Sequence, residues 1–280
     1  MAILMDGKKL AEELFVDLKA EIKTLSGIPQ LKAIQVGENA ESSVYIKHKK
    51  AKCAEVGIGF SLLKLNKDIS TEDLLEQIDL INDDDNVDGI LVQLPLPKTI
   101  DTKLIMQSIA PWKDIDGFNP YNKGLLDLGE ETLIPPTASG VMSLIEKYEI
   151  KLQGQHAVVL GAGEIAGKPV AKLFLNAGAT VTICTKDTYD IVDFTSVADI
   201  IVSAVGMKDL FHGNDVKPGV VVINIGITKD INNEIHGDPE FESVAKKASY
   251  ITPTPGGTGP LTVFHLLKNT VECYKNMRQL

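Results

Sequence analysis

The chain has 280 residues, 44% of them hydrophobic, and a formal net charge of −10 at pH 7. This length suits one large domain or two ordinary ones, and the apolar content excludes disorder as the main state. The acidic excess, with no long basic stripe to offset it, argues against nucleic acid as the main partner.

Three cysteines, Cys53, Cys184 and Cys273, are far apart and lie in apolar stretches. That pattern predicts reduced thiols in a cytoplasmic protein. The sequence contains neither Cys-x-x-Cys nor His-Glu-x-x-His, so we expect no bound metal. The apolar run at the start is too short for a signal peptide, and no stretch resembles a membrane span, so we expect no membrane partner.

The first part of the chain alternates between helical and strand patterns. The predicted elements are a helix over residues 7–25, a strand over 31–36, a helix over 42–56, a strand over 60–65, a helix after Ser70 and a strand over 87–93. This rhythm predicts a parallel sheet covered on both faces. Ligands bind beyond the carboxyl ends of such strands, and Gln93 lies at one of those ends.

The helix predicted over residues 42–56 carries a candidate acid–base pair. Asn39 precedes it as an N-cap. Tyr45 and Lys49 are four residues apart and share one face, which Cys53 and Val56 continue toward a core. The alternative interpretation is an ordinary amphipathic surface with solvated lysines.

Residues 111–136 are rich in glycine and proline and lack a sustained period, which predicts a connection between two units. Asp114 and Asp116 within it are typical of turns. A helix is expected over residues 137–148.

The second unit begins with a strand over residues 156–160. Gly161, Gly163 and Ala166 follow it and fit the pattern G-x-G-x-x-G/A. Further strands are predicted over residues 179–184, 200–204 and 220–225. These elements predict a dinucleotide-binding Rossmann-like unit; the alternative is an α/β unit that keeps its glycines for packing. Near the end, a loop dominated by proline and glycine lets the backbone approach a ligand, and a helix is expected from Leu261 onward.

A series of motifs runs along nearly the whole chain in a specific order. They are Tyr-x-x-x-Lys at Tyr45 and Lys49, VQLPLP at 92–97, KDIDGF at 113–118, N-x-G at 122–124, HAVVLG at 156–161, NIGI at 224–227, GD at 237–238 and PTPGGTGPLT at 253–262. Together they resemble the bifunctional methylenetetrahydrofolate dehydrogenase/methenyltetrahydrofolate cyclohydrolases.

The resemblance implies two α/β domains that flank a cleft, the second of them Rossmann-like. Residues 1–118 with a C-terminal helix over 262–280 would form a folate-binding catalytic domain, and residues 119–261 an NAD(P)-binding domain. It also implies oxidation of 5,10-methylenetetrahydrofolate with a nicotinamide cofactor and hydrolysis of the methenyl product to 10-formyltetrahydrofolate. The protein would act on tetrahydrofolate derivatives as a homodimer.

Lys49 takes the family's catalytic lysine position. A free lysine, with a pKa of about 10.4, is almost wholly protonated at neutral pH. A partly dry cleft, the nearby Lys52 and the cationic substrate would lower that pKa and allow Lys49 to move protons. Tyr45 would orient the amine or stack on the substrate, Gln93 would hydrogen-bond Lys49, and Asp116 would accept hydrogen bonds from the pterin.

The resemblance assigns two sets of binding residues. Expected contacts with the folate are made by Tyr45, Lys49, Val92, Gln93, Leu94, Asp116, Pro255, Gly256, Gly257, Gly259, Pro260 and Thr262. Expected contacts with the cofactor are made by Gly161, Ala162, Gly163, Ile165, Lys186 and Ile227.

The chain departs from the family where the NADP 2′-phosphate is recognised. Ala162 and Gly163 replace a usual Arg-Ser, and Thr185 and Lys186 replace a usual His-Ser. Lys186 restores one point charge, so we expect NADP, whereas Asp187 is a candidate for binding the ribose of NAD. Two alternatives stay open: a cyclohydrolase with a weak or NAD-dependent dehydrogenase, and a non-catalytic folate- or nucleotide-binding protein.

Overall fold

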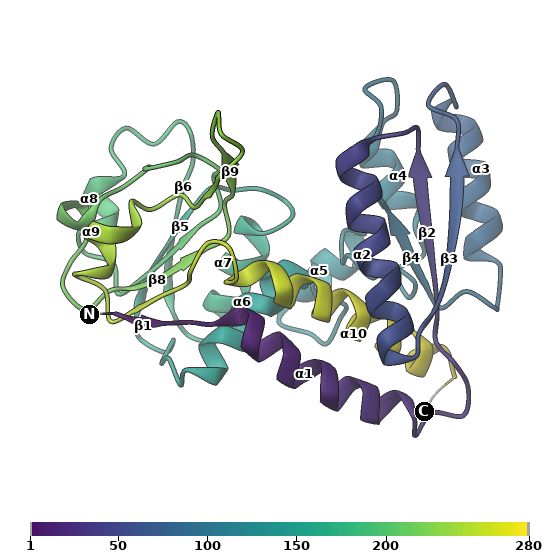
Figure 1. Ribbon diagram of the computed structural model, residues 1–280, viewed down its shortest axis with the longest axis horizontal. Helices are drawn as coiled ribbons and strands as arrows, with labels where there is room; N and C mark the ends of the chain where they lie inside the picture. The colour runs from purple at the N-terminus through teal and green to yellow at the C-terminus, as the bar shows by residue number, and fades with distance from the viewer. Residues whose placement is uncertain (1, 279–280) are drawn as a thin grey trace. The chain divides into compact units, whose positions relative to one another are not determined.

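The computed structural model describes residues 2–278, and the side chains of all of these except residues 40 and 41. The chain forms two compact units (Figure 1). We call them the six-stranded unit, Met1–Glu12 with Thr137–Thr262, and the three-stranded unit, Glu13–Pro136 with Val263–Leu280. Most of the C-terminal helix is thus grouped with the three-stranded unit.

This division differs from the expected domain boundaries in two places. Residues 1–12 belong to the six-stranded unit because strand β1 (Ile3–Leu4) pairs with β11 (Tyr250–Ile251). Residues 119–136 belong to the three-stranded unit, where Asn119 and Asn122 are hydrogen-bonded to the buried Asp114.

The three-stranded unit contains a parallel sheet in the order β3-β2-β4. Its strands are β2 (Gln30–Val36), β3 (Gly59–Leu65) and β4 (Gly89–Val92), and its helices are α2 (Ala40–Val56), α3 (Thr71–Asn82), α4 (Thr102–Ser108) and α5 (Pro120–Leu128). Helices α1 (Gly7–Ile22) and α10 (Thr258–Arg278) contribute most of their length to it.

One face of this sheet packs on α3 and α4, and α2 lies on the other face (Figure 1). The first face buries Ile34, Ile90 and Val92 against isoleucines of α3 and α4. Because side chains alternate along a strand, the residues between them, such as Ala33 and Leu91, are buried on the opposite face. A sheet apolar on both faces is typical of parallel α/β units.

The six-stranded unit contains a parallel sheet in the order β1-β11-β8-β7-β5-β6. Besides β1 and β11, its strands are β5 (His156–Leu160), β6 (Thr180–Cys184), β7 (Ile200–Ser203) and β8 (Val221–Asn224), with a hairpin of β9 (Thr228–Lys229) and β10 (Ile235–His236). Its helices are α6 (Pro136–Lys147), α7 (Gly167–Asn176), α8 (Val192–Thr195) and α9 (Phe241–Ala245), with a short 3-10 turn, η1 (Gly213–Asp215).

The expected strands are confirmed to within two residues at each end. The sequence pattern does not predict helix α5, because residues 111–136 lack a sustained hydrophobic period. Its start is nevertheless marked in the sequence, since Asn119 accepts the Tyr121 amide at 2.8 Å and Pro120 occupies the first turn. Helix α10 begins at Thr258, before the expected Leu261. Among the described residues, no helix is long and apolar enough to cross a membrane.

Candidate active site and dinucleotide pocket

Helix α2 carries Tyr45 and Lys49 on one face, as predicted. The Asn39 side chain accepts the Ser42 amide at 3.0 Å and caps the helix. Further along this face Cys53 is buried, while Lys49 is half-buried and Tyr45 is 60% exposed. The face therefore runs from core to solvent, with the amine at the transition.

Lys49 and Gln93 come together although they are far apart in sequence. The Lys49 Nζ donates to Gln93 Oε1 at 3.2 Å, and Gln93 Nε2 donates to the carbonyl of Leu94 at 2.7 Å. Gln93 directly follows β4, and its own amide donates to the Ile34 carbonyl of β2 at 2.9 Å. The expected position of Gln93 at the carboxyl edge of the sheet is thereby confirmed, and its amide fixes the amine without adding charge.

Burial favours the neutral forms of two groups in this region and therefore shifts their pKa values in opposite directions. It lowers the pKa of Lys49, an effect that the Asp116 carboxylate opposes. It raises the pKa of Asp116 to about 7, opposed by Lys49 and reinforced by Asp114. The expectation that Lys52 lowers the Lys49 pKa is wrong: the cause is desolvation, and Lys52 Nζ pairs with Glu55 at 2.8 Å.

Asp114 is more than the turn residue that we expected. Its buried carboxylate accepts the Asn119 amide at 2.7 Å and the Asn122 side chain at 3.1 Å. Asn269 of α10 donates to the carbonyl of Ile115 at 2.8 Å. Asp114 and Ile115, which directly precede Asp116, are thus held by hydrogen bonds, and they keep Asp116 near Lys49.

Val92 and Leu94, the other expected folate contacts of this unit, lie at the end of β4. The Val92 side chain is buried in the core, so only its backbone is available to a ligand. Leu94 is partly buried against the same core, and its carbonyl accepts the Gln93 amide.

The expected folate contacts Pro255, Gly256, Gly257, Gly259, Pro260 and Thr262 belong to the six-stranded unit, where they form a loop and the first turn of α10. Gly256 has a φ of 105°, and a Cβ on Gly257 would lie 2.7 Å from the Pro253 carbonyl. A Cβ on Gly259 would meet no described atom within 4 Å. Gly256 and Gly257 are therefore required by the fold, and Gly259 is not.

A pocket of about 470 Å³ opens at the carboxyl edge of the six-stranded sheet. It is lined by residues 163–167 after β5, residues 204–206 after β7, and Ile225 and Gly226 after β8. Because β5 lies between β6 and β7, strand order reverses here, which is where α/β sheets bind ligands. The amino end of α7 also faces this pocket and favours a phosphate group.

Three glycines at or next to this pocket have different structural roles. A Cβ on Gly167 would lie 1.8 Å from the Gly161 carbonyl, and one on Gly161 would lie 2.7 Å from the Ala204 carbonyl. A Cβ on Gly163 would meet no described atom within 4 Å. Gly161 and Gly167 thus close the turn onto the helix, and Gly163 leaves room that a dinucleotide can use. Sequence reasoning placed the third small residue at Ala166 and missed Gly167.

Of the remaining cofactor candidates, only Ile165 is among the residues that line this pocket. The Ile165 side chain is 52% exposed. Ile227, which directly follows the lining residue Gly226 in the chain, is 55% exposed. Ala162 lies within the turn between Gly161 and Gly163. Lys186 is exposed in the turn after β6, whose last carbonyl, that of Cys184, accepts the Gly161 amide at 2.9 Å.

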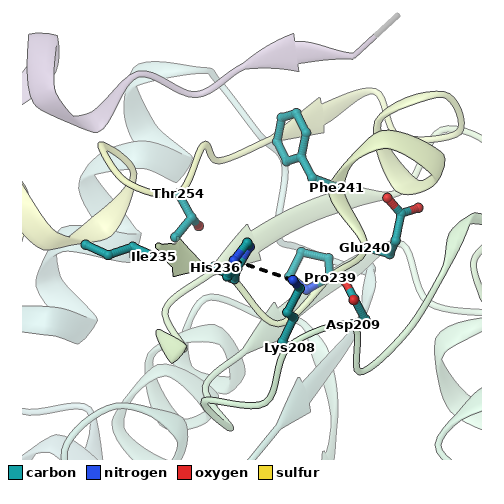
Figure 2. Close-up of a pocket in the computed structure, with 9 residues that line it drawn as sticks. Lys208, Asp209, Ile235, His236, Pro239, Glu240, Phe241 and Thr254 are labelled. Atoms are coloured by element: carbon teal, nitrogen blue, oxygen red, sulfur yellow. Dashed lines mark hydrogen bonds between the residues drawn. The ribbon is translucent and has the colours of Figure 1, made fainter. Parts of the chain in front are cut away.

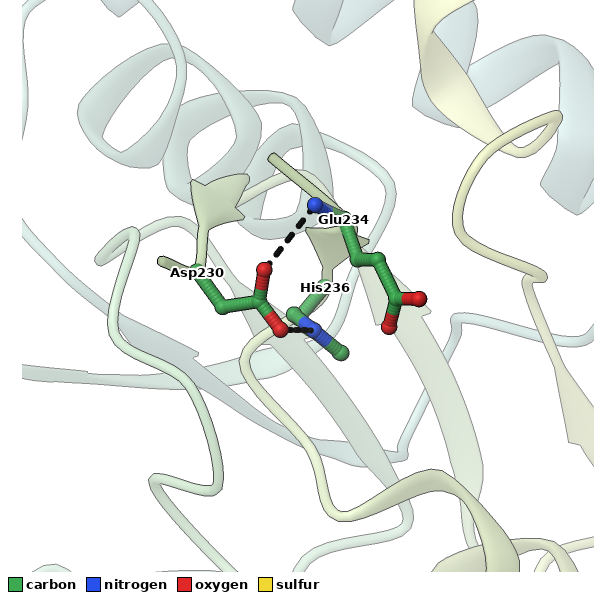
Figure 3. Close-up of side chains that lie close together, drawn as sticks. All are labelled: Asp230, Glu234 and His236. Atoms are coloured by element: carbon green, nitrogen blue, oxygen red, sulfur yellow. Dashed lines mark hydrogen bonds and ion pairs between the residues drawn. The ribbon is translucent and has the colours of Figure 1, made fainter. Parts of the chain in front are cut away.

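A cluster of titratable side chains and a second pocket lie near the β9–β10 hairpin. Asp230, Glu234 and His236 gather at the β9–β10 hairpin, with His236 Nε2 3.0 Å from Asp230 (Figure 3). Lys208 Nζ lies 3.4 Å from the same nitrogen, and both residues line a second pocket of about 330 Å³ (Figure 2). An ammonium group this close opposes cation binding, so we assign no metal to the cluster.

Comparison with known proteins identifies the two units. Residues 5–116 match the catalytic domain of the tetrahydrofolate dehydrogenase/cyclohydrolase family, and residues 135–278 match its NAD(P)-binding domain. The chain belongs to the tetrahydrofolate dehydrogenase/cyclohydrolase family. Members oxidise methylenetetrahydrofolate and hydrolyse methenyltetrahydrofolate, so the predicted enzyme class and two-domain α/β fold are confirmed.

Relatives within the family are similar over their full length. The bifunctional protein FolD of Hydrogenobaculum sp. strain Y04AAS1 is 46% identical over 274 residues, which are 97% of this chain and 98% of that protein. The crystal structure of the bifunctional FolD enzyme from Campylobacter jejuni superposes with a TM-score of 0.97 at 46% identity, covering 99% of both chains. The structure of the Trypanosoma brucei enzyme, solved with NADP and an inhibitor, superposes with a TM-score of 0.93 at 35% identity. The match covers 100% of this chain and 99% of that one.

Proposed function

We propose that this chain carries out both family reactions and that Lys49 moves the protons of the hydrolytic one. The observation that carries this proposal is the half-buried Lys49 amine, held by Gln93 at 3.2 Å and lowered in pKa by burial. A neutral amine is a base, and its ammonium form is an acid, so one group can serve both halves of a hydrolysis.

In the hydrolysis, the neutral Lys49 amine takes a proton from the water that adds to the methenyl carbon. The ammonium then gives that proton to N5 as the carbon–N5 bond breaks. The hydroxyl of the adduct loses its own proton to the amine that is regenerated, and from there to solvent, which leaves the formyl group on N10 and releases one proton overall. Gln93 holds the amine through its uncharged carbonyl, so it does not stabilise the ammonium as a carboxylate would.

The folate contacts in this proposal are those that the family resemblance assigns. Asp116 accepts hydrogen bonds from the donor edge of the pterin, which suits a carboxylate. Tyr45 is exposed enough to stack on the ligand. Backbone groups of Val92 and Leu94, and the loop with Pro255, Gly256, Gly257, Gly259, Pro260 and Thr262, supply the remaining contacts. The three-stranded unit is then the folate-binding catalytic domain, and the six-stranded unit the NAD(P)-binding domain.

The cofactor that we propose is NADP. The amino end of α7 and the free space beside Gly163 suit a pyrophosphate, and Ile165 and Ile227 offer apolar contacts. A bound nicotinamide would supply the acceptor for the hydride of the methylene carbon. Lys186 is the cation nearest in sequence to the end of β6, where the adenosine ribose binds in such folds, and it favours a 2′-phosphate. The Trypanosoma brucei relative was solved with NADP.

Steady-state oxidation of methylenetetrahydrofolate, measured once with NADP and once with NAD, tests this assignment. We expect a lower KM with NADP. A preference for NAD would contradict the assignment and indicate that Asp187 binds the ribose of NAD. No oxidation with either cofactor would indicate a protein that acts mainly as a cyclohydrolase.

We further propose a cytoplasmic homodimer that binds neither nucleic acid nor membranes. All three cysteines are free and buried, in keeping with a reducing compartment. At the β6 edge of the six-stranded sheet, Ile183 is 41% exposed and Leu175 of α7 is 52% exposed. An unpaired edge with apolar side chains is suited to a second copy. Light scattering tests the dimer, and an Ile183→Asp variant is expected to be monomeric.

A further inference from the structure

Asp238 is a buried carboxylate with a full set of hydrogen bonds. Its Oδ2 accepts the Ser203 hydroxyl at 2.6 Å and the Val205 amide at 2.9 Å. Its Oδ1 accepts the amides of Gly206 and Met207, each at 2.9 Å. The side chain is fully buried, and four donors use the acceptor capacity of a carboxylate.

The segment that Asp238 holds is a wall of the dinucleotide pocket. Residues 204–206 line the pocket, and three of the four donors to Asp238 are consecutive backbone amides of residues 205–207. A Cβ on Gly226, which lines the same pocket, would lie 2.2 Å from Asp238 Oδ1. The carboxylate therefore lies directly behind the pocket wall, in space that a glycine leaves free.

Asp238 is itself fixed by other parts of the unit. Its amide donates to Asn224 Oδ1 at 3.0 Å, and its carbonyl accepts the Leu210 amide at 2.7 Å. The Asn224 side chain also donates to the Gly226 carbonyl at 2.8 Å and to Thr254 Oγ1 at 2.9 Å. Asp238 is thus held by the end of β8, and it holds the segment after β7 in turn.

We propose that Asp238 is a positioning residue for the nicotinamide cofactor, which sets the path of residues 205–207 without touching the ligand. This inference rests on the proposed dinucleotide site. In Asp238→Asn one oxygen becomes an NH₂ donor that faces N–H donors, so at least one wall amide loses its acceptor. The wall then moves, and cofactor affinity falls while the three-stranded unit keeps its chemistry.

Asp199 provides a matched control. Its carboxylate accepts the His156 amide at 2.7 Å and pairs with Lys217, but it lies at the amino ends of β5 and β7, opposite the pocket. Asp199→Asn removes a hydrogen-bonded, partly exposed carboxylate from the same sheet without changing the pocket wall. This variant tests whether a general loss of stability in the same sheet is enough to weaken NADP binding.

The experiment measures NADP binding by calorimetry on the full chain, together with the KM for NADP, the cofactor-free hydrolysis of methenyltetrahydrofolate and the melting temperature. For Asp238→Asn we expect a Kd and KM for NADP raised by about tenfold or more, with hydrolysis within about twofold of wild type. For Asp199→Asn we expect a lower melting temperature with NADP affinity within about twofold of wild type.

Unchanged NADP affinity in Asp238→Asn, or an equal loss in both variants, would overturn the inference. If Asp238→Asn does not fold, Ser203→Ala removes a single donor and is expected to weaken NADP binding about two- to fivefold; no change there would also overturn it. Failure of the wild type to bind NADP or NAD would instead overturn the proposed cofactor site.

Discussion

The two units place their sites at the same topological feature but build them differently. In each sheet one strand lies between the two strands that follow it in the chain, β2 between β3 and β4, and β5 between β6 and β7. The three-stranded unit presents side chains there, Lys49, Gln93 and Asp116, of which two have shifted pKa values. The six-stranded unit presents backbone and glycines, held from behind by Asp238.

This difference follows from what each site must do. Proton transfer needs groups that change charge readily, and partial burial of an amine and a carboxylate provides them. Dinucleotide binding needs amides at fixed positions, and a fully hydrogen-bonded wall provides those. Substitutions should therefore separate the two functions.

The largest expected effect is that of Lys49→Met. Loss of a general acid–base group typically costs about 10²–10⁴ in rate, so hydrolysis of methenyltetrahydrofolate should fall by that factor. Calorimetric NADP affinity should remain that of the wild type, because no residue of the dinucleotide pocket changes. Lys47→Met, on the exposed side of the same helix, is the matched control and should hydrolyse normally.

A pair of glycine variants tests the backbone site. Gly167→Ala places a Cβ 1.8 Å from the Gly161 carbonyl and should destabilise the protein by at least about 2 kcal/mol in denaturant unfolding. Gly163→Ala meets no described atom within 4 Å, so its unfolding should match the wild type while NADP binding weakens severalfold. Equal stability losses in both would contradict the distinct tasks assigned to these glycines.

Asp116 should make folate binding depend on pH. Its pKa of about 7 means that the carboxylate, which is the accepting form, is lost as pH falls through this value. The KM for the folate should therefore rise below about pH 7 in the wild type. Asp116→Asn should raise the KM about tenfold at high pH and remove this pH dependence. A wild-type KM that is constant between about pH 6 and 8 would contradict the assignment.

The smallest effect is expected for Lys186→Ala. An exposed charge contributes about 0.2–1 kcal/mol, so the Kd for NADP should rise about two- to fivefold and the Kd for NAD should not change. Parallel changes for both cofactors would exclude recognition of the 2′-phosphate by Lys186.

Much of this arrangement could be predicted because it depends on local patterns. The spacing of Tyr45 and Lys49 and the N-cap at Asn39 identify the face of α2, and apolar runs identify every long strand. Gln93 was predictable at a strand end because parallel sheets present their carboxyl ends to ligands.

The parts that sequence did not reveal depend on tertiary packing. The bonds from Asp238 to residues 205–207 join segments more than thirty residues apart. The GD and NIGI motifs mark Asp238 and Asn224, but the motifs do not state their partners. Similarly, Lys52 was expected to act on Lys49 from sequence proximity, whereas burial is the actual cause of the lowered pKa.

The pH dependence of single-turnover hydrolysis tests the central claim most directly. If the Lys49 amine is the base, the rate should increase with pH along a limb whose apparent pKa lies below the ordinary lysine value of 10.5, and this limb should persist in Asp116→Asn. Lys49→Met should lack it. A wild-type rate that is flat with pH, or a limb that survives in Lys49→Met, would contradict the account.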